Sequence, residues 1–296
     1  RRELQFFLDH RVPQVKFVDR TFNCNHRHSM AIWRYIKEHD NGITNFHFEI
    51  AADILNEEEM DLLATFRPGL AQLEIGVQST NIQTIHEIDR VMDFDMVTQK
   101  VQRVASAENI HQHLDLIAGL PYENLESFKK SFNDVYRLRP QQFQLGFLKV
   151  LKGSKMHEKA GEYGIVYHTR PMYEVLSTNW LTYDEVIYLK GIEEMVEVYY
   201  NSCQFRCTMR ALEAEFNTPF AMYEALAEYY EENALNGLKH SRMGRFDILH
   251  DFILSYVKKE HAPKYEDDLL MDLYLREKSK SRPSWAADLS GYKSEI

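Results

Sequence analysis

The stretch AQLEIGVQ at residues 71–78 alternates strictly between apolar and polar side chains. Successive side chains of a β-strand point to opposite faces, so its apolar residues share one face and its polar residues share the other. The same alternation recurs in NFHFEI at 45–50 and in HQHLDLI at 111–117. The sequence therefore predicts a sheet with one apolar face and one polar face.

Strand-like runs alternate with helical patterns along the first half of the chain. Two further strands are predicted at 14–19 and 142–148. The helical patterns lie between the strands, at 1–10, 28–39, 56–66, 81–89, 95–107 and 124–138. Five successive βα units imply parallel strands joined by right-handed helical crossovers. Helices can cover the apolar face of such a sheet, and the polar face then has to line a lumen.

We therefore predict an α/β fold, an incomplete TIM-type parallel β/α barrel of five βα units. This partial barrel is expected to span residues 1–155. The long helical and charged stretches beyond it predict an α-helical C-terminal extension with a charged tail over residues 156–296. The segment from Val257 onward mixes charge runs with Pro and Ser, which predicts a peripheral helix and a tail.

Two helix starts carry capping signals. Asn56 followed by Glu59 matches a variant of the capping box, in which two side chains satisfy the free N–H groups of a helix start. Asn124 stands directly before an apolar stripe with helical spacing, which predicts an N-cap.

Composition narrows the class of protein. The chain has 296 residues, 44% hydrophobic and 27% charged, as is ordinary for a globular protein. A net charge of −10 argues against sequence-independent binding of nucleic acid. No apolar run approaches the roughly 20 residues of a membrane span, so we expect no membrane partner. Three cysteines argue against a disulfide scaffold and favour the reducing cytoplasm.

Polar residues stand at or near the carboxyl ends of the predicted strands. They are Asp19, Glu49, Gln78 and Asp115. In β/α barrels the working residues lie at this edge, which makes these side chains candidates for ligand binding. A structural reading of Asp115, as a buried acid bonded to a neighbouring strand, stays open.

Three segments resemble the radical S-adenosylmethionine (SAM) superfamily: VKFVDRTFNCN at 15–25, LEIGVQS at 73–79 and HLDLIAGLPYEN at 113–124. The likeness is closest to the cobalamin-associated branch, described as Fe–S oxidoreductases or magnesium-protoporphyrin IX monomethyl ester oxidative cyclases. It covers residues 1 to about 155. It implies a cytoplasmic enzyme that acts on a small-molecule substrate.

The resemblance implies roles for single residues. Glu49 matches an acid that holds the amino group of SAM, and Arg90 an arginine that pairs with its carboxylate. Gln78 matches a residue that bonds the ribose or the amino-acid end, and Asp115 matches a ribose-binding acid. These residue types suit the zwitterionic end of SAM, because an acid can bind its ammonium group and a planar guanidinium can bind its carboxylate.

The turn after the fourth strand has its own implied role. The backbone of Ala118, Gly119, Leu120 and Pro121 matches the segment that lies along the adenine. Glycine lets the backbone approach a flat ring closely, and proline fixes the turn.

The chain departs from the superfamily at its cysteines. The C-x3-C-x2-C loop that ligates a [4Fe–4S] cluster is absent from the sequence, and Cys24, Cys203 and Cys207 do not replace it. We expect the missing strand and cluster loop to lie upstream of Arg1, in the same polypeptide. The implied cofactors are then SAM, bound here, and a [4Fe–4S] cluster and cobalamin, bound by segments absent from this sequence. No metal ligand is assigned, although His47 and His113 share the inward face.

The leading hypothesis is the C-terminal part of a radical SAM Fe–S oxidoreductase, which supplies the SAM-binding barrel wall and the substrate floor and is inactive alone. One alternative is a cofactor-free TIM-barrel lyase or aldolase, which would need Lys149 or Lys152 as catalytic lysine. Another is a non-catalytic scaffold that binds a partner through the helical extension.

Overall fold

The computed structural model describes residues 1–276 and 282–286. Residues 277–281 and 287–296, which belong to the predicted charged tail, lie outside the described residues. The chain divides into two compact units, Arg1–Lys190 and Gly191–Ile296. The boundary predicted at residue 155 concerned the end of the barrel strands and stays a prediction.

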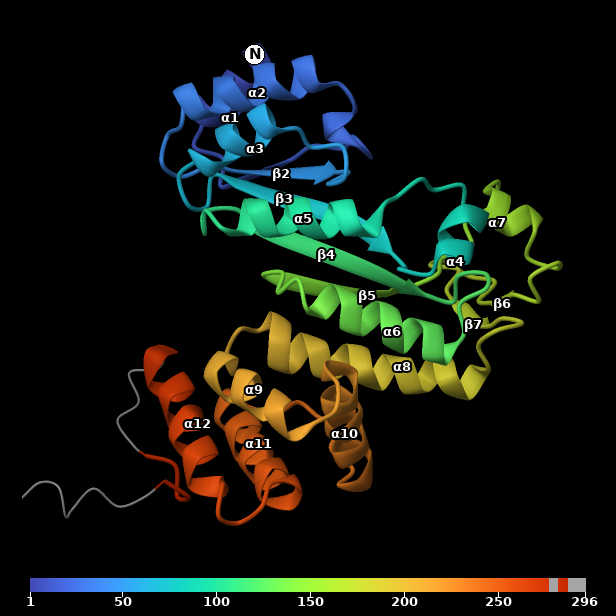
Figure 1. The fold of residues 1–296 in the computed structure, drawn as a ribbon, viewed down its shortest axis with the longest axis vertical. Coiled ribbons are helices and arrows are strands. Elements are labelled where there is room, and N and C mark those ends of the chain that lie inside the picture. Colours follow the sequence, from blue (N-terminus) through green and yellow to red (C-terminus); the bar gives the residue numbers. More distant parts are fainter. Residues whose placement is uncertain (277–281, 287–296) are drawn as a thin grey trace, which may run out of the picture. The chain divides into compact units, whose positions relative to one another are not determined.

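The first unit is built on a parallel sheet whose strands follow chain order, β1-β2-β3-β4-β5 (Figure 1). The strands are β1 (Gln14–Lys16), β2 (Asn45–Ile50), β3 (Ala71–Gln78), β4 (His111–Ala118) and β5 (Gln142–Phe147). The sheet curls into half a barrel, and helices lie around it. The predicted incomplete TIM-type barrel is therefore confirmed, with β1 shorter than expected.

Helices connect the strands where the sequence predicts them. They are α1 (Arg2–Asp9), α2 (His26–Glu38), α3 (Glu57–Ala64), α4 (Ile82–Glu87), α5 (Phe94–Ala105) and α6 (Leu125–Tyr136), with a 3-10 turn at Phe22–Cys24. The predicted capping box is present, with Asn56 and Glu59 bonded reciprocally. Asn124 caps α6 by accepting from the Ser127 N–H at 2.9 Å.

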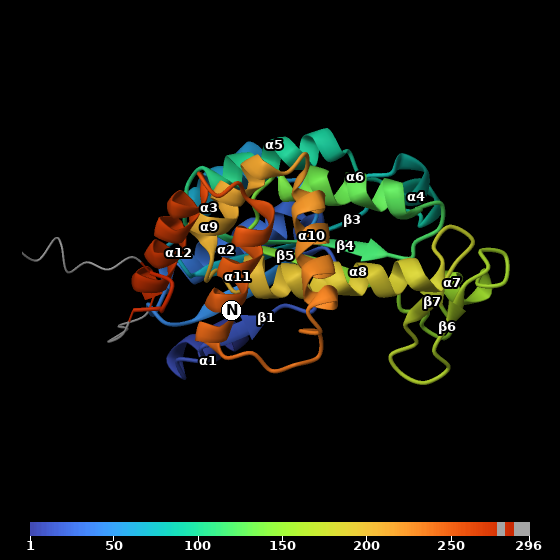
Figure 2. The ribbon, with the colours of Figure 1, turned by 90° about the horizontal axis from the view of Figure 1, so that it is seen from below.

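The apolar face of the sheet is buried under these helices. Trp33 of α2 meets Phe48 of β2 edge to face, and Phe132 of α6 packs on Phe143 of β5. All four side chains are fully buried. Figure 2 shows α5 and α6 on the same side of β3 and β4. Each such aromatic contributes roughly 1.5–3 kcal/mol by leaving water, so this face holds the first unit together.

The polar face is formed in register across the sheet. Along β3 every second side chain is buried and the others are partly exposed. Glu74 stands opposite Glu49 of β2 and His113 of β4, and Gly76 stands opposite Asp115. The alternation read in the sequence therefore places the predicted polar residues on one inner face.

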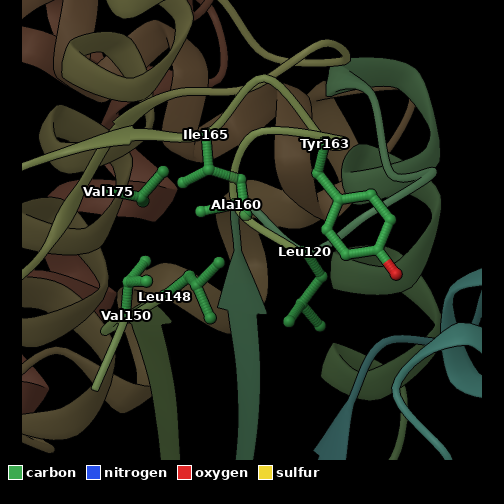
Figure 3. Packing of buried hydrophobic residues seen from close by; sticks show 7 residues of the cluster. All are labelled: Leu120, Leu148, Val150, Ala160, Tyr163, Ile165 and Val175. Carbon is green, nitrogen blue, oxygen red and sulfur yellow. The ribbon is translucent and has the colours of Figure 1, made fainter. Parts of the chain in front are cut away.

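An antiparallel hairpin follows the barrel strands and was not predicted. Its strands are β6 (Val166–Tyr167) and β7 (Val175–Ser177), and α7 (Lys155–Glu158) precedes them. A buried cluster joins this region to the ends of β4 and β5, formed by Leu120, Leu148, Val150, Ala160, Tyr163, Ile165 and Val175 (Figure 3). The hairpin thereby covers the turn after β4.

The second unit is helical. Its elements are the end of α8 (Tyr183–Val196), a π-helical turn (Glu197–Asn201), α9 (Arg206–Leu212), α10 (Pro219–Glu232), α11 (Arg242–Tyr256) and α12 (Ala262–Arg276). The helix predicted after Val257 is α12, and it packs on the unit through one buried face. Leu269 and Leu273 are fully buried, and Asp272 accepts from the N–H groups of Cys207 and Thr208 at 2.9 Å, which caps α9. No helix in the described part of the chain is long and apolar enough to span a membrane.

Substitution of Gly119 should test how tightly the hairpin covers this turn. Gly119 has φ +90°, and a Cβ there would lie 2.8 Å from Cγ1 of Val175. Gly119→Ala should therefore lower the free energy of unfolding by about 1 kcal/mol for the left-handed backbone and roughly 1–3 kcal/mol more for overpacking. Urea unfolding measures both terms together.

Gly153→Ala is the matched control, because Gly153 has φ +79° and nothing within 4 Å of its added Cβ. Gly153→Ala should lower the free energy of unfolding only by the contribution of the left-handed backbone, about 1 kcal/mol. Equal destabilisation by the two substitutions would contradict close packing of the hairpin on Gly119.

Candidate functional site

Asp115 lies near the end of β4 on the inner face. Its Oδ1 accepts from the Val77 N–H at 3.0 Å, and its Oδ2 lies 3.3 Å from the Gln78 Nε2 donor. Burial raises the pKa of Asp115 to about 6, against the opposing effects of the Arg90 guanidinium and the Val77 N–H. At neutral pH the group is mostly a carboxylate, with bonding capacity left over.

Gly76 lets two polar side chains cross the inner face. A Cβ at Gly76 would lie 2.5 Å from Nε2 of Gln78 and 3.2 Å from Nη2 of Arg90. Arg90 Nη2 donates to the Gly76 carbonyl oxygen. A side chain at position 76 would push both groups away from Asp115.

Gln78 occupies a strained position. Its φ is +67°, a left-handed conformation that is uncommon for residues other than glycine, and the β3–β4 register shifts between Gly76 and Gln78. Such strain persists where the surroundings impose it and is concentrated at functional sites. The bulge turns the Gln78 amide toward Asp115.

Glu49 lies on the same face, at the end of β2. Burial raises its pKa, and the neighbouring Glu74 raises it further, while Lys16 and Arg90 act in the opposite direction. Glu74 is itself paired with Lys16 at 2.8 Å. Arg90 thus acts electrostatically on both Glu49 and Asp115, and Gln78 lies beside Asp115. These four predicted site residues form one cluster.

The turn at 118–121 is buried and bonded within the protein. The Ala118 carbonyl accepts from the Leu148 N–H at 2.9 Å, and the Pro121 carbonyl accepts from Thr84 Oγ1 at 2.9 Å. Leu120 packs into the hairpin cluster (Figure 3). The structure thus gives this turn a packing role, and its predicted contact with adenine stays a prediction.

The loop that carries Arg90 is braced by α7 and the residues after it. Lys159 Nζ lies 2.8 Å from Glu87 Oε1 and 2.8 Å from the buried Tyr163 hydroxyl, which also donates to Glu87. Lys155 pairs with Asp89, the residue before Arg90. Sequence reasoning missed this brace, because its partners are more than 60 residues apart.

Glu123 is the buried centre of a second network, behind the turn. Its Oε1 accepts from Ser79 Oγ at 2.7 Å and from Ser131 Oγ at 2.9 Å. Its Oε2 has no hydrogen-bond partner among the described residues. The side chain is completely buried, and this burial raises its pKa to about 7, against the bonds from the serines.

This network ties two loops together. Ser79 directly follows Gln78, and Asn81 donates from Nδ2 to the Tyr122 carbonyl at 2.9 Å and to Ser127 Oγ at 3.0 Å. The loop after β3 and the loop after β4 are thereby fixed to each other. The position of the Gln78 amide beside Asp115 depends on this connection.

The inward-facing histidines lie deeper on the same face. His47 Nε2 lies 2.8 Å from Glu74 Oε2, and burial lowers the pKa of both His47 and His113. No three His, Cys, Asp or Glu side chains in residues 1–276 and 282–286 are arranged to hold a metal ion. Asp19 lines a cavity of about 580 Å³ beside α1 and α2, together with Lys16.

Two curated proteins are similar to most of this chain. Over 239 residues it is 24% identical to 2-(S-pantetheinyl)-carbapenam-3-carboxylate methyltransferase of Streptantibioticus cattleyicolor, covering 74% of this chain and 33% of that protein. Over 260 residues it is 25% identical to the cobalamin-dependent radical SAM methyltransferase TokK of Streptomyces tokunonensis, covering 80% and 36%. The predicted resemblance to the radical SAM superfamily is confirmed. The chain spans about a third of the length of these relatives.

Other comparisons concern the C-terminal half and the fold. A family described as "Protein of unknown function (DUF4080)" matches residues 161–296. The radical SAM methyltransferase TsrM from Kitasatospora setae superimposes with a TM-score of 0.48 at 16% identity, over 61% of this chain and 37% of that one. Coproporphyrinogen III oxidase (HemN) from Escherichia coli gives a TM-score of 0.42 at 17% identity, over 64% and 50%. The fold assignment here rests on the strand order and register.

Replacing Glu123 should remove a pH dependence of stability. With a folded pKa of about 7 and an ordinary value of 4.5, the acid binds its proton more tightly in the folded state. Its stabilising effect is therefore complete below pH 4.5 and is lost as the pH rises to 7. From pH 5 to pH 8, Glu123→Gln should gain about 2 kcal/mol of unfolding free energy relative to wild type.

Urea unfolding at both pH values measures this difference, and the shift of Asp115 cancels because both proteins carry it. Glu126→Gln, at an exposed position of α6, is the control and should follow wild type. A constant difference between Glu123→Gln and wild type across this range would show that the buried carboxyl does not titrate as described.

Proposed function

We propose that this chain is part of a radical SAM enzyme and supplies the barrel wall that binds SAM. The observation that carries the proposal is the convergence of Glu49, Gln78, Arg90 and Asp115 on one inner face. Glu49 comes from β2, Gln78 from β3 and Asp115 from β4, and Arg90 comes from the loop that follows α4. The sequence likeness to radical SAM methyltransferases supports the same assignment.

The cluster has the groups that SAM requires. Glu49 would hold the ammonium group, and burial among other acids favours a cation there. Arg90 would bind the carboxylate with donors not used on Gly76. Asp115 and Gln78 would hold the ribose hydroxyls, because a carboxylate accepts two hydrogen bonds and an amide can donate and accept.

The cysteines of this chain do not fit a [4Fe–4S] cluster. Cys24, Cys203 and Cys207 do not form the C-x3-C-x2-C pattern, and no group of three metal-ligating side chains occurs in residues 1–276 and 282–286. In radical SAM enzymes the cluster supplies the electron that cleaves SAM. We propose that its ligands, and any cobalamin site, lie in parts of a longer polypeptide.

Methyl transfer is the reaction class that we propose for the intact enzyme, in place of the predicted oxidoreductase chemistry. Both similar proteins are named as methyltransferases, and one as cobalamin-dependent. A small molecule is the proposed acceptor, held against the polar face below the SAM site. The aldolase alternative has less support, because Lys149 and Lys152 are both exposed.

Equilibrium dialysis with labelled SAM tests the binding wall. Wild type should bind, and Asp115→Asn and Arg90→Gln should each weaken binding about tenfold or more, because each removes a charged hydrogen-bonding partner. Glu126→Gln changes an exposed charge and should bind like wild type. Wild type that fails to bind 1 mM SAM, or Asp115→Asn that matches the control, would contradict the proposal.

Iron and sulfide analysis after anaerobic reconstitution tests the location of the cluster. This chain should retain neither at stoichiometric levels, because its cysteines do not form a ligand set. Stoichiometric iron and sulfide that survive gel filtration would show that the chain ligates the cluster itself. SAM binding is measured separately, so the two parts of the proposal fail independently.

A further inference from the structure

Arg90, the residue proposed to bind the SAM carboxylate, follows a helix end that carries two acids. Glu87 is the last residue of α4, and Asp89 directly precedes Arg90. The carboxyl end of a helix carries a partial negative charge, so both acids stand where a helix disfavours them. Carboxylates this close in the chain can also occupy the guanidinium donors that a ligand needs.

The backbone around Arg90 is fixed by a Schellman motif. The Arg90 N–H donates to the Ile85 carbonyl at 3.0 Å, and the Asp89 N–H donates to the His86 carbonyl at 3.1 Å. Asp89 has a φ of +55°, the left-handed conformation that this motif requires. Because the backbone is set, what remains to be decided is which acid the Arg90 side chain meets.

Lys159 binds one of the two acids directly. Its Nζ lies 2.8 Å from Glu87 Oε1 and 2.8 Å from the Tyr163 hydroxyl, which itself donates to Glu87. Lys159, and to a lesser extent Tyr163, hold the pKa of Glu87 below its ordinary value, so the group is a carboxylate at neutral pH. Lys155 pairs with Asp89 at a more exposed position.

Both sides of this contact are anchored in one buried cluster. Tyr163 is 2% exposed, and Figure 3 shows its ring at the edge of the cluster with the hydroxyl pointing outward. Ala160, next to Lys159, is buried in the same cluster, and Ile88, next to Glu87, packs against it. The two segments are fixed before the ion pair forms, so less side-chain entropy is lost than in most exposed pairs.

We propose that Lys159 is a positioning residue for Arg90, because by binding Glu87 it keeps the guanidinium available for the carboxylate of SAM. This inference rests on the proposed function, in which Arg90 binds that carboxylate. Arg90 already uses Nη2 on the Gly76 carbonyl. Its other donors serve the ligand only if Glu87, three residues earlier, is bound elsewhere.

Equilibrium dialysis of the full chain with labelled SAM and with labelled decarboxylated SAM tests this role. Lys159→Met removes the charge and keeps an unbranched side chain. It should weaken binding of SAM about fivefold, because the released Glu87 competes for Arg90. Decarboxylated SAM has no carboxylate for Arg90, so its affinity should stay within about twofold of the wild-type value.

The double variant Lys159→Met/Glu87→Gln separates positioning from stability. It lacks the ion pair, as the single variant does, but it also lacks the competing acid. It should therefore bind SAM like wild type, even if both variants melt at a lower temperature. Lys37→Met, at an exposed position of α2, removes one positive charge and should bind both ligands like wild type.

Three outcomes would overturn the role of Lys159 and leave the SAM site in place. They are a Lys159→Met variant that binds SAM like Lys37→Met, equal weakening of both ligands by Lys159→Met, and a double variant that binds SAM as weakly as Lys159→Met. Wild type that binds neither ligand would instead contradict the SAM-binding wall itself, and this inference with it.

Discussion

A parallel sheet with one apolar and one polar face can be stable when helices cover the first face and the sheet curls around the second. In this chain β2, β3 and β4 pair in a register that aligns their side chains. Their apolar side chains therefore pack under the same helices, and their polar side chains line the same inner face. A slip of one residue in any strand would exchange the two faces. The site residues are therefore positioned by the same alternation that buries the core.

The chemistry at the strand ends depends on how two loops are joined. Gln78 has a left-handed conformation, and Ser79, the next residue, is bonded to the buried Glu123. Arg90 reaches the Gly76 carbonyl from a loop braced by Lys159 and Tyr163. The buried Glu123 and the contacts of Lys159 and Tyr163 with Glu87 thus fix the loops that carry the donors near Asp115. The strands alone would not place these donors.

Much of the fold could be predicted from local pattern, because strand alternation, helix stripes and caps such as Asn56 are properties of neighbouring residues. The inward direction of Glu49 and Asp115 followed from the same pattern. The hairpin β6–β7 could not, since its strands are two and three residues long and its stability comes from packing on Leu120 and Gly119. The bulge at Gln78 was also invisible, because it arises from contacts with β4.

Asp115 and Glu123 are buried carboxyl groups eight positions apart, and burial has different consequences for them. Both have raised pKa values, but Arg90 faces Asp115, whereas the bonds that oppose the shift of Glu123 come from serine hydroxyls. At neutral pH Asp115 is mostly ionised and can accept hydrogen bonds from a diol. Glu123 is near its midpoint, so its bonds to the loops are made at a cost in stability. This loss of stability occurs at Glu123, whose network joins the loop after Gln78 to the loop after Asp115.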